Sequence, residues 1–142
     1  MEIWRQAAID DLKRYNSLHQ SIINIKEEIA DIDDRLSVSG YTISAVPVQG
    51  GSSKIEDKYN NSIVIKDRLQ RTLEQNIKDY KRIKRTLDQM SEQEQKLLYY
   101  AYINRTSNYI KVIMDTFNIE SAQAYRYVNN ALNRYVLIRY GV

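Results

Sequence analysis

Apolar residues recur along the first quarter of the chain at the spacing of a helix that packs against another helix. They stand alternately three and four positions apart, at Tyr15, Leu18, Ile22, Ile25, Ile29, Ile32 and Leu36. This alternation averages about 3.5 residues and keeps one apolar stripe on the face toward a partner helix. The positions between them, from Lys26 to Arg35, are mostly charged, as on a solvated face. The pattern predicts a long helix over residues 2–36 with a coiled-coil seam.

Residues 37–54 interrupt this pattern. They hold three of the four glycines and the only proline of the chain. Both residue types disfavour the interior of a helix, so we expect a long, partly mobile loop here. A weak alternation of apolar residues leaves a short extended stretch open, at Tyr41, Ile43, Val46 and Val48.

A second helical stripe follows the expected loop. Its apolar positions are Ile55, Tyr59, Ile63, Leu69, Leu73, Ile77, Tyr80, Ile83 and Leu87, with one gap. Two long helices with one apolar stripe each pack most economically as an antiparallel hairpin. The end of the second helix carries five basic residues between Lys78 and Arg85. Such a run is usually a solvated face, but it could also lie beside a DNA backbone.

A capping box marks the next helix start. Ser91 and Glu94 have the Ser-x-x-Glu spacing in which hydroxyl and carboxylate reciprocally bond backbone N–H groups. We therefore expect a helix from about Glu92 through Tyr102. Residues 104–108 then have the composition of a turn, and a shorter helix follows that carries Ile110, Ile113 and Met114.

Residues 113–131 have the form of two helices joined by a tight turn. Asn118 stands where the turn needs a positive φ, which asparagine tolerates better than any residue except glycine. An apolar plug and two residues with capping oxygens follow, at Ile119, Glu120 and Ser121. Any tight turn between two helices with small residues can mimic this pattern. It is nevertheless the arrangement of a helix-turn-helix, whose second helix enters the major groove of DNA.

The second helix of this pair is predicted to have an inward and an outward face. The inward face comprises Ala124, Ala131 and either Tyr127 or Val128. The outward face, which is the candidate DNA-binding surface, comprises Ser121, Ala122, Tyr125, Arg126 and Asn129. Lys111 and Arg134 are expected to contact phosphates at most. For Arg126, three roles stay open: reading a base, binding a phosphate, or a structural position that is merely solvated or paired with Glu120.

Two segments carry motifs of a known family. They are Met90-Ser91-Glu92-Gln93-Glu94-Gln95-Lys96-Leu97-Leu98 and Ala124-Tyr125-Arg126-Tyr127-Val128-Asn129-Asn130-Ala131-Leu132. With them the chain resembles the phage ArpU/RinA-type transcriptional regulators, whose C-terminal part is similar to the sigma-factor domain that reads the −35 promoter element. The resemblance implies an activator of phage late or packaging genes in the bacterial cytoplasm, with host RNA polymerase as a candidate partner.

The chain departs from the family pattern at three positions. Met114 stands where alanine is usual, and Ala122 and Gln123 stand where basic residues are frequent. The predicted recognition helix therefore has few phosphate-binding charges. Because two linked half-sites reinforce each other, dimerisation through the hairpin would compensate for weak binding by one copy.

The composition bounds the remaining possibilities. The 142 residues have a net charge of +3, with five basic and eight acidic residues in 1–36 but ten and six in 54–90. A basic C-terminal part permits polyanion binding without proving it. There is no cysteine, and His19 is the only histidine, so we expect no metal site and no cofactor. No nucleophile or phosphate-loop motif indicates an enzyme, and no apolar run is long enough to span a membrane.

These observations together predict an all-α protein of two parts. Residues 1–90 are expected to form a long antiparallel helical hairpin, with a mobile loop at 37–54, that makes the protein a homo-oligomer. Residues 91–142 are expected to form a C-terminal helix-turn-helix domain that binds double-stranded DNA sequence-specifically and regulates transcription. The alternative is a helical assembly or adaptor protein, such as a packaging subunit or a protein-binding regulator, with secondary or no sequence-specific DNA contact.

Overall fold

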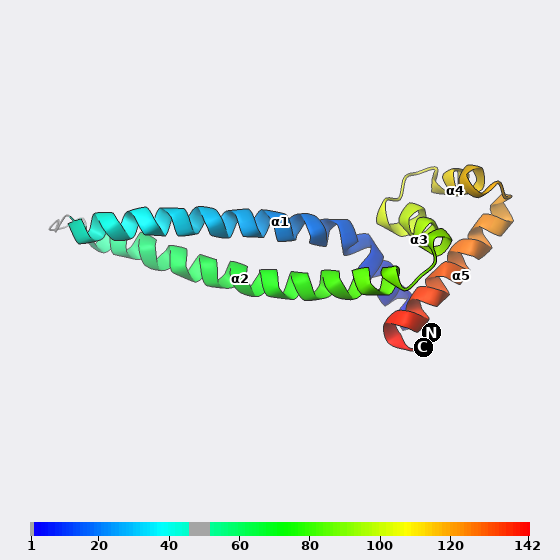
Figure 1. Cartoon of the computed structure of the whole chain (residues 1–142), viewed down its shortest axis with the longest axis horizontal. Helices are drawn as coiled ribbons and strands as arrows, with labels where there is room; N and C mark the ends of the chain where they lie inside the picture. The colour runs from blue at the N-terminus through cyan, green and yellow to red at the C-terminus, as the bar shows by residue number, and fades with distance from the viewer. Residues whose placement is uncertain (1, 46–51) are drawn as a thin grey trace. The chain divides into compact units, whose positions relative to one another are not determined.

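Helices make up the regular structure of the described part of the chain. The computed structural model describes the backbone of residues 2–45 and 52–142 and the side chains of residues 2–37 and 56–142. The elements are α1 (Glu2–Ala45), α2 (Ser52–Asp88), α3 (Glu92–Leu98), the π-helical turn η1 (Tyr99–Ile103), α4 (Tyr109–Phe117) and α5 (Ser121–Tyr140) (Figure 1). No strand occurs within these residues, which confirms the all-α class. None of these helices has the length and apolarity that crossing a membrane requires.

α1 continues past its expected end. Helical backbone covers residues 37–45, and α2 already begins at Ser52, so the prediction of a loop over 37–54 is wrong at both of its ends. Residues 37–45 contain Gly40 but no proline, and one glycine in a helix interior costs only about 1 kcal/mol. The rest of the predicted loop, residues 46–51, lies outside the described residues.

The chain divides into two compact units. One combines residues 1–18 with 79–142, and the other consists of residues 19–78. In the 19–78 unit, segments of α1 and α2 lie side by side (Figure 1). The amide of Asn76 donates a hydrogen bond of 3.0 Å to the Ser21 hydroxyl, and Lys66 pairs with Asp33. Because the earlier α1 residue meets the later α2 residue, the two segments run in opposite directions.

The face of α2 toward α1 departs from the predicted stripe at Ile63. Four half-buried residues spaced four, three and four apart define this face: Ser62, Lys66, Leu69 and Leu73. Ile63 is 42% exposed and does not belong to it, so its predicted place in the stripe is wrong. Lys66 can occupy this partly buried position because it forms an ion pair with Asp33. It stands in the gap of the predicted apolar stripe, between Ile63 and Leu69.

The unit of residues 1–18 and 79–142 has one continuous apolar core. α5 contributes more of it than any other helix, with Ala124, Val128, Ala131, Leu132, Tyr135 and Val136 all buried. The other helices of the unit add Ala8, Leu12, Ile83, Leu87, Leu97, Leu98 and Ile113. The predicted inward face of α5 is thus confirmed at Ala124 and Ala131. Of the two alternatives between them, Val128 is buried and Tyr127 is half-buried.

The start of α3 confirms the predicted capping box. The Glu94 amide donates to Ser91 Oγ at 3.1 Å, and the Ser91 amide donates to Glu94 Oε1 at 3.0 Å. The expected α-helix through Tyr102 is wrong beyond Leu98, where the π-helical turn η1 begins. The Asn104 amide donates to the Tyr99 carbonyl at 2.7 Å, a bond over five residues that widens the helix.

Asp11 joins the first turns of α1 to the last turns of α5. Its Oδ2 accepts hydrogen bonds from the hydroxyls of Tyr140 (2.8 Å) and Tyr135 (3.3 Å) and lies 3.5 Å from Arg139 Nε. The carboxylate is only 13% exposed. The ring of Trp4 packs against that of Tyr140, with the centroids 5.0 Å apart. A buried carboxylate is unfavourable unless it is paired, so these donors specify where α1 docks.

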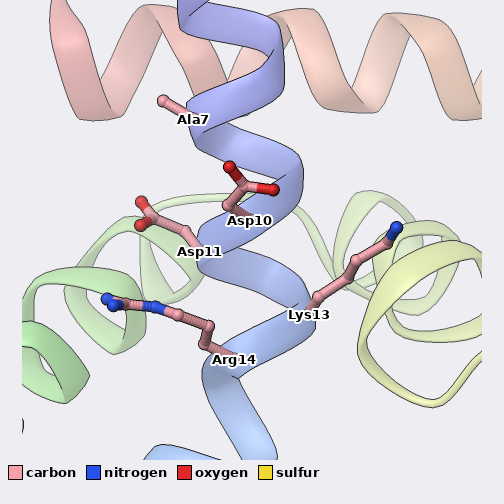
Figure 2. A pocket seen from close by; sticks show the side chains of 5 residues that line it. All are labelled: Ala7, Asp10, Asp11, Lys13 and Arg14. Atoms are coloured by element: carbon pink, nitrogen blue, oxygen red, sulfur yellow. The ribbon is translucent and has the colours of Figure 1, made fainter.

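The same part of α1 also contacts the end of α2. Asp11 and Arg14 project to the same side of α1, whereas Lys13 projects to the opposite side (Figure 2). The Arg14 guanidinium lies 3.5 Å from the Asp79 carboxylate, and the rings of Tyr15 and Tyr80 stack with centroids 5.1 Å apart. Residues 1–18 are therefore held to both α5 and the last turns of α2.

Replacing Asp11 with asparagine should lower the free energy of unfolding by about 3 kcal/mol. The substitution removes the charge that accepts both tyrosine hydrogen bonds and leaves the Arg139 guanidinium without its counter-ion. Urea unfolding followed by circular dichroism measures the change. Asp10→Asn, at an exposed neighbouring position, is the matched control and should change the stability by less than about 0.5 kcal/mol. Equal midpoints for the two variants would contradict the role assigned to Asp11.

The stability should also fall at alkaline pH. Burial raises the pKa of Tyr140 from 10.0 to about 12, and the hydrogen bond to Asp11 and its charge add to this effect. Burial likewise raises the pKa of Tyr135. Because the folded state holds the Tyr140 proton more tightly than the unfolded state, the contribution of Tyr140 to stability is complete below pH 10 and is lost as the pH rises through about 12. In Asp11→Asn the carboxylate that helps to raise the pKa of Tyr140 is missing, so alkaline unfolding should begin at a lower pH than in the wild-type protein. Identical unfolding profiles against pH for the two proteins would argue against this linkage.

Candidate nucleic-acid interface

The turn between α4 and α5 is built around Asn118. Its φ of 54° and ψ of 55° are left-handed, and it is the one non-glycine residue with positive φ in the described part of the chain. The amides of Asn118 and Ile119 both donate to the Met114 carbonyl, which ends α4. The predicted positive φ at Asn118 is therefore confirmed, and Ile119 packs, half-buried, against the core.

α5 begins without a side-chain cap. Glu120 occupies the N-cap position in an extended conformation, and the Ala124 amide donates to its carbonyl at 2.9 Å. The Glu120 side chain makes no capping hydrogen bond and Ser121 is already helical, so the predicted capping oxygens are wrong. Glutamate is a poorer N-cap than aspartate, asparagine or serine. The first amides of α5 are consequently left for other acceptors.

The predicted DNA-contacting residues are all exposed. Five lie on α5, at Ser121, Ala122, Tyr125, Arg126 and Asn129, and two more are Lys111 on α4 and Arg134 on α5. The structure brings Ala122, Arg126 and Asn129 onto one stripe by their spacing of four and three residues. Ser121 and Tyr125 lie along its edge.

The same stripe continues further along α5 than the sequence interpretation recognised. Arg126, Asn129, Asn130 and Asn133 stand at positions i, i+3, i+4 and i+7, and all are exposed. We call these four residues the outward stripe. The helical spacing from Arg126 was the signal that could have found Asn130 and Asn133. Guanidinium and carboxamide groups give this stripe several hydrogen-bond donors and three amide acceptors.

The charge of α5 is entirely positive. From Ser121 to Val142 the sequence has three arginines and no acidic residue. Arg139 lies at Asp11, whereas neither a hydrogen bond nor an ion pair joins Arg126 or Arg134 to any residue that the structure describes. The alternative that Arg126 pairs with Glu120 therefore finds no contact between these two described residues. Both guanidinium groups are available to an anion.

Arg5 adds a further positive group to the outward stripe. From α1, its guanidinium donates hydrogen bonds to Oδ1 of Asn133 (2.5 Å) and Oδ1 of Asn129 (3.2 Å). These contacts engage the amide oxygens and leave the Nδ2 donors of both asparagines for other acceptors. The sequence gave no signal for Arg5, because no local pattern pairs residues more than 120 positions apart.

The described residues also line hollows away from α5. One is lined by Ala7, Asp10, Asp11, Lys13 and Arg14, all from α1 (Figure 2). Another, of about 390 Å³, is lined by Tyr15, Asn16, Leu87, Asp88, Glu92, Gln95, Lys96, Tyr99 and Ile103. Among the residues with described positions, no three histidine, aspartate or glutamate side chains gather as metal ligands would. The exposed face of α5 differs from these hollows in its charge, because its arginines are accompanied by no acidic residue from Ser121 onward.

Comparison with known proteins places the chain in a family. The model of a family described as "Protein of unknown function (DUF1492)" matches residues 36–135. This match covers more than half of the chain, so the protein belongs to that family. It includes α2, α3, α4 and most of α5. No curated protein and no solved structure matches the chain.

Proposed function

We propose that this protein is a sequence-specific DNA-binding transcription regulator in which α4 and α5 form a helix-turn-helix. The observation that carries the proposal is the division of α5 into two faces. Ala124, Val128 and Ala131 are buried, while Arg126 and the asparagines of the outward stripe are exposed and no acidic residue follows Glu120. In this proposal the outward stripe enters the major groove.

The side chains of the outward stripe suit the chemistry of base edges. An arginine donates two parallel hydrogen bonds to O6 and N7 of guanine, which is the role assigned to Arg126. An asparagine side chain can form two hydrogen bonds with adenine, to N6 and N7, and Asn130 is free to make both. In Asn129 the side-chain oxygen already accepts a hydrogen bond from Arg5, so its pairing with adenine would differ. The uncapped first amides of α5 and the exposed Lys111 and Arg134 suit phosphate oxygens.

The regulator is proposed to act as a homo-oligomer. Ala122 and Gln123 stand on the first turn of α5 where related recognition helices carry basic residues, so one copy offers few phosphate contacts. Two copies on two half-sites would raise the affinity without any new contact type. The residues of the 19–78 unit, with α1 and α2 side by side as a helical hairpin, are assigned to this association. No catalytic role and no cofactor are part of the proposal.

The likeness to ArpU/RinA-type regulators adds a biological setting to this proposal. It favours activation of phage late or packaging genes in the bacterial cytoplasm, with host RNA polymerase as the partner at the promoter. The segments that carry the likeness lie in α3 and α5, which pack together in one core.

Selection of bound duplexes from a random-sequence library by the full-length protein tests the proposal. Titrations of the selected duplex and a random duplex at several salt concentrations then give the preference. A regulator should bind its selected site at least about 10³-fold more tightly than random DNA. Equal binding of all duplexes would overturn the proposal and favour the alternative of a helical assembly or adaptor protein.

Arg126→Ala should weaken binding to the selected site by about 1–3 kcal/mol and relax the preference at one base pair, because a bidentate contact to guanine is lost. Fluorescence anisotropy on the selected site and its single-base variants measures both effects. Arg134→Ala is the matched control on the same helix and should weaken binding to all duplexes alike, with a salt slope smaller by about 1. A uniform loss for Arg126→Ala would assign it to phosphate. Unchanged affinity would remove the main support for placing α5 in the groove.

A further inference from the structure

The 19–78 unit leaves much of its apolar side-chain surface uncovered. Ile23 on α1 is 38% exposed, and Ile63, Val64 and Ile65 on α2 are 42%, 50% and 51% exposed. Among the described residues of this unit only Ile22 and Ile32 are buried. Two paired helices with so few buried residues have a core that is small for independent stability.

One turn of α2 carries three consecutive apolar residues, Ile63, Val64 and Ile65. Successive helical residues point about 100° apart, so these three side chains cover three directions around the axis. Ser62 and Lys66 face α1, and Ile63 and Ile65 therefore flank that contact while Val64 points away from it. A helix that is apolar all round is typical of one surrounded by other helices. α1 lies on the side of Ser62 and Lys66, so all three of these apolar side chains stay partly exposed.

The charges on the two helices favour a second copy of the same chain as the cover. Residues 19–37 of α1 carry two basic and five acidic side chains, whereas residues 58–78 of α2 carry five basic and two acidic ones. α1 of one copy therefore complements α2 of another.

The positions of the apolar residues fit a two-fold arrangement. The contacts Asn76–Ser21 and Lys66–Asp33 place Ile65 at the level of residues 33–34 of α1. Ile23 lies about ten residues from that level, or about 15 Å along the helix. A two-fold axis can lie perpendicular to the helices, midway between these two levels. It places Ile23 of each copy at the level of Ile63–Ile65 of the other copy, so the same contact forms twice.

We propose that the surface formed by Ile23, Ile63, Val64 and Ile65 binds a second copy of this chain, with the two 19–78 units antiparallel in a four-helix assembly. The proposal rests on the homo-oligomer assigned above to the 19–78 unit and names its surface and orientation, but it does not depend on DNA binding. Its tests use the protein without DNA, so a failure of one proposal is distinguishable from a failure of the other.

The orientation can be tested by cross-linking, because the chain contains no cysteine. Full-length Ile23→Cys and Ile65→Cys variants are prepared separately, mixed, and treated with a short bis-maleimide cross-linker. An antiparallel pair should give cross-linked dimers in the mixture that join one Ile23→Cys chain to one Ile65→Cys chain. Each variant alone should give much less product. Cross-links mainly within the Ile65→Cys variant alone would indicate a parallel pair, and no cross-links in any sample would overturn the proposal.

Sedimentation at micromolar concentration tests the association itself. The wild-type protein should sediment at twice the chain mass of 16.8 kDa. Ile65→Asp should raise the dimer dissociation constant by at least about tenfold, because it buries a charge in the apolar contact. Gln93→Asp, at an exposed position of α3 outside the 19–78 unit, is the control and should remain dimeric with unchanged helical content. A wild-type protein that sediments only as 16.8 kDa would overturn the proposal.

Discussion

The largely buried carboxylate of Asp11 is the constraint on which the arrangement of the C-terminal helices depends. It accepts hydrogen bonds from Tyr135 and Tyr140 and lies beside Arg139, so both ends of the chain belong to one core. These contacts lie in the last turns of α5. The first half of that helix keeps its outward face exposed, and Arg5 of α1 hydrogen-bonds to Asn129 and Asn133 of the outward stripe. The anchor and the candidate interface therefore occupy different parts of a single helix.

Local signals predicted a large part of this structure. Helical spacing identified α1 and α2 over most of their length, and the Ser-x-x-Glu pattern located the start of α3. Asn118 was recognisable because few residues tolerate a positive φ, and the buried and exposed faces of α5 followed from its spacing. Each of these features depends on residues within a few positions of one another. That is the range over which periodicity, caps and turn chemistry act.

Features that depend on distant residues could not be predicted in this way. Asp11 and Arg5 acquire their roles from partners more than 120 positions away. The exposed position of Ile63 follows from a helix face that includes Lys66, a residue that apolar periodicity overlooks but that an ion pair to Asp33 accommodates. The continuation of α1 to Ala45 shows that one glycine is a weak helix terminator. The π-helical turn at Tyr99–Ile103 has no sequence signature that we recognise.

We propose above that the outward stripe of α5 contacts DNA. NMR spectra of the labelled full-length protein, recorded with and without a selected duplex, test it most directly because every amide reports its own surroundings. The account predicts that the largest shifts fall on residues 121–133 of α5, with smaller ones at Lys111 and Arg5, and that they weaken as salt is added. Shifts confined to residues 19–78, with the signals of α5 unchanged, would contradict it.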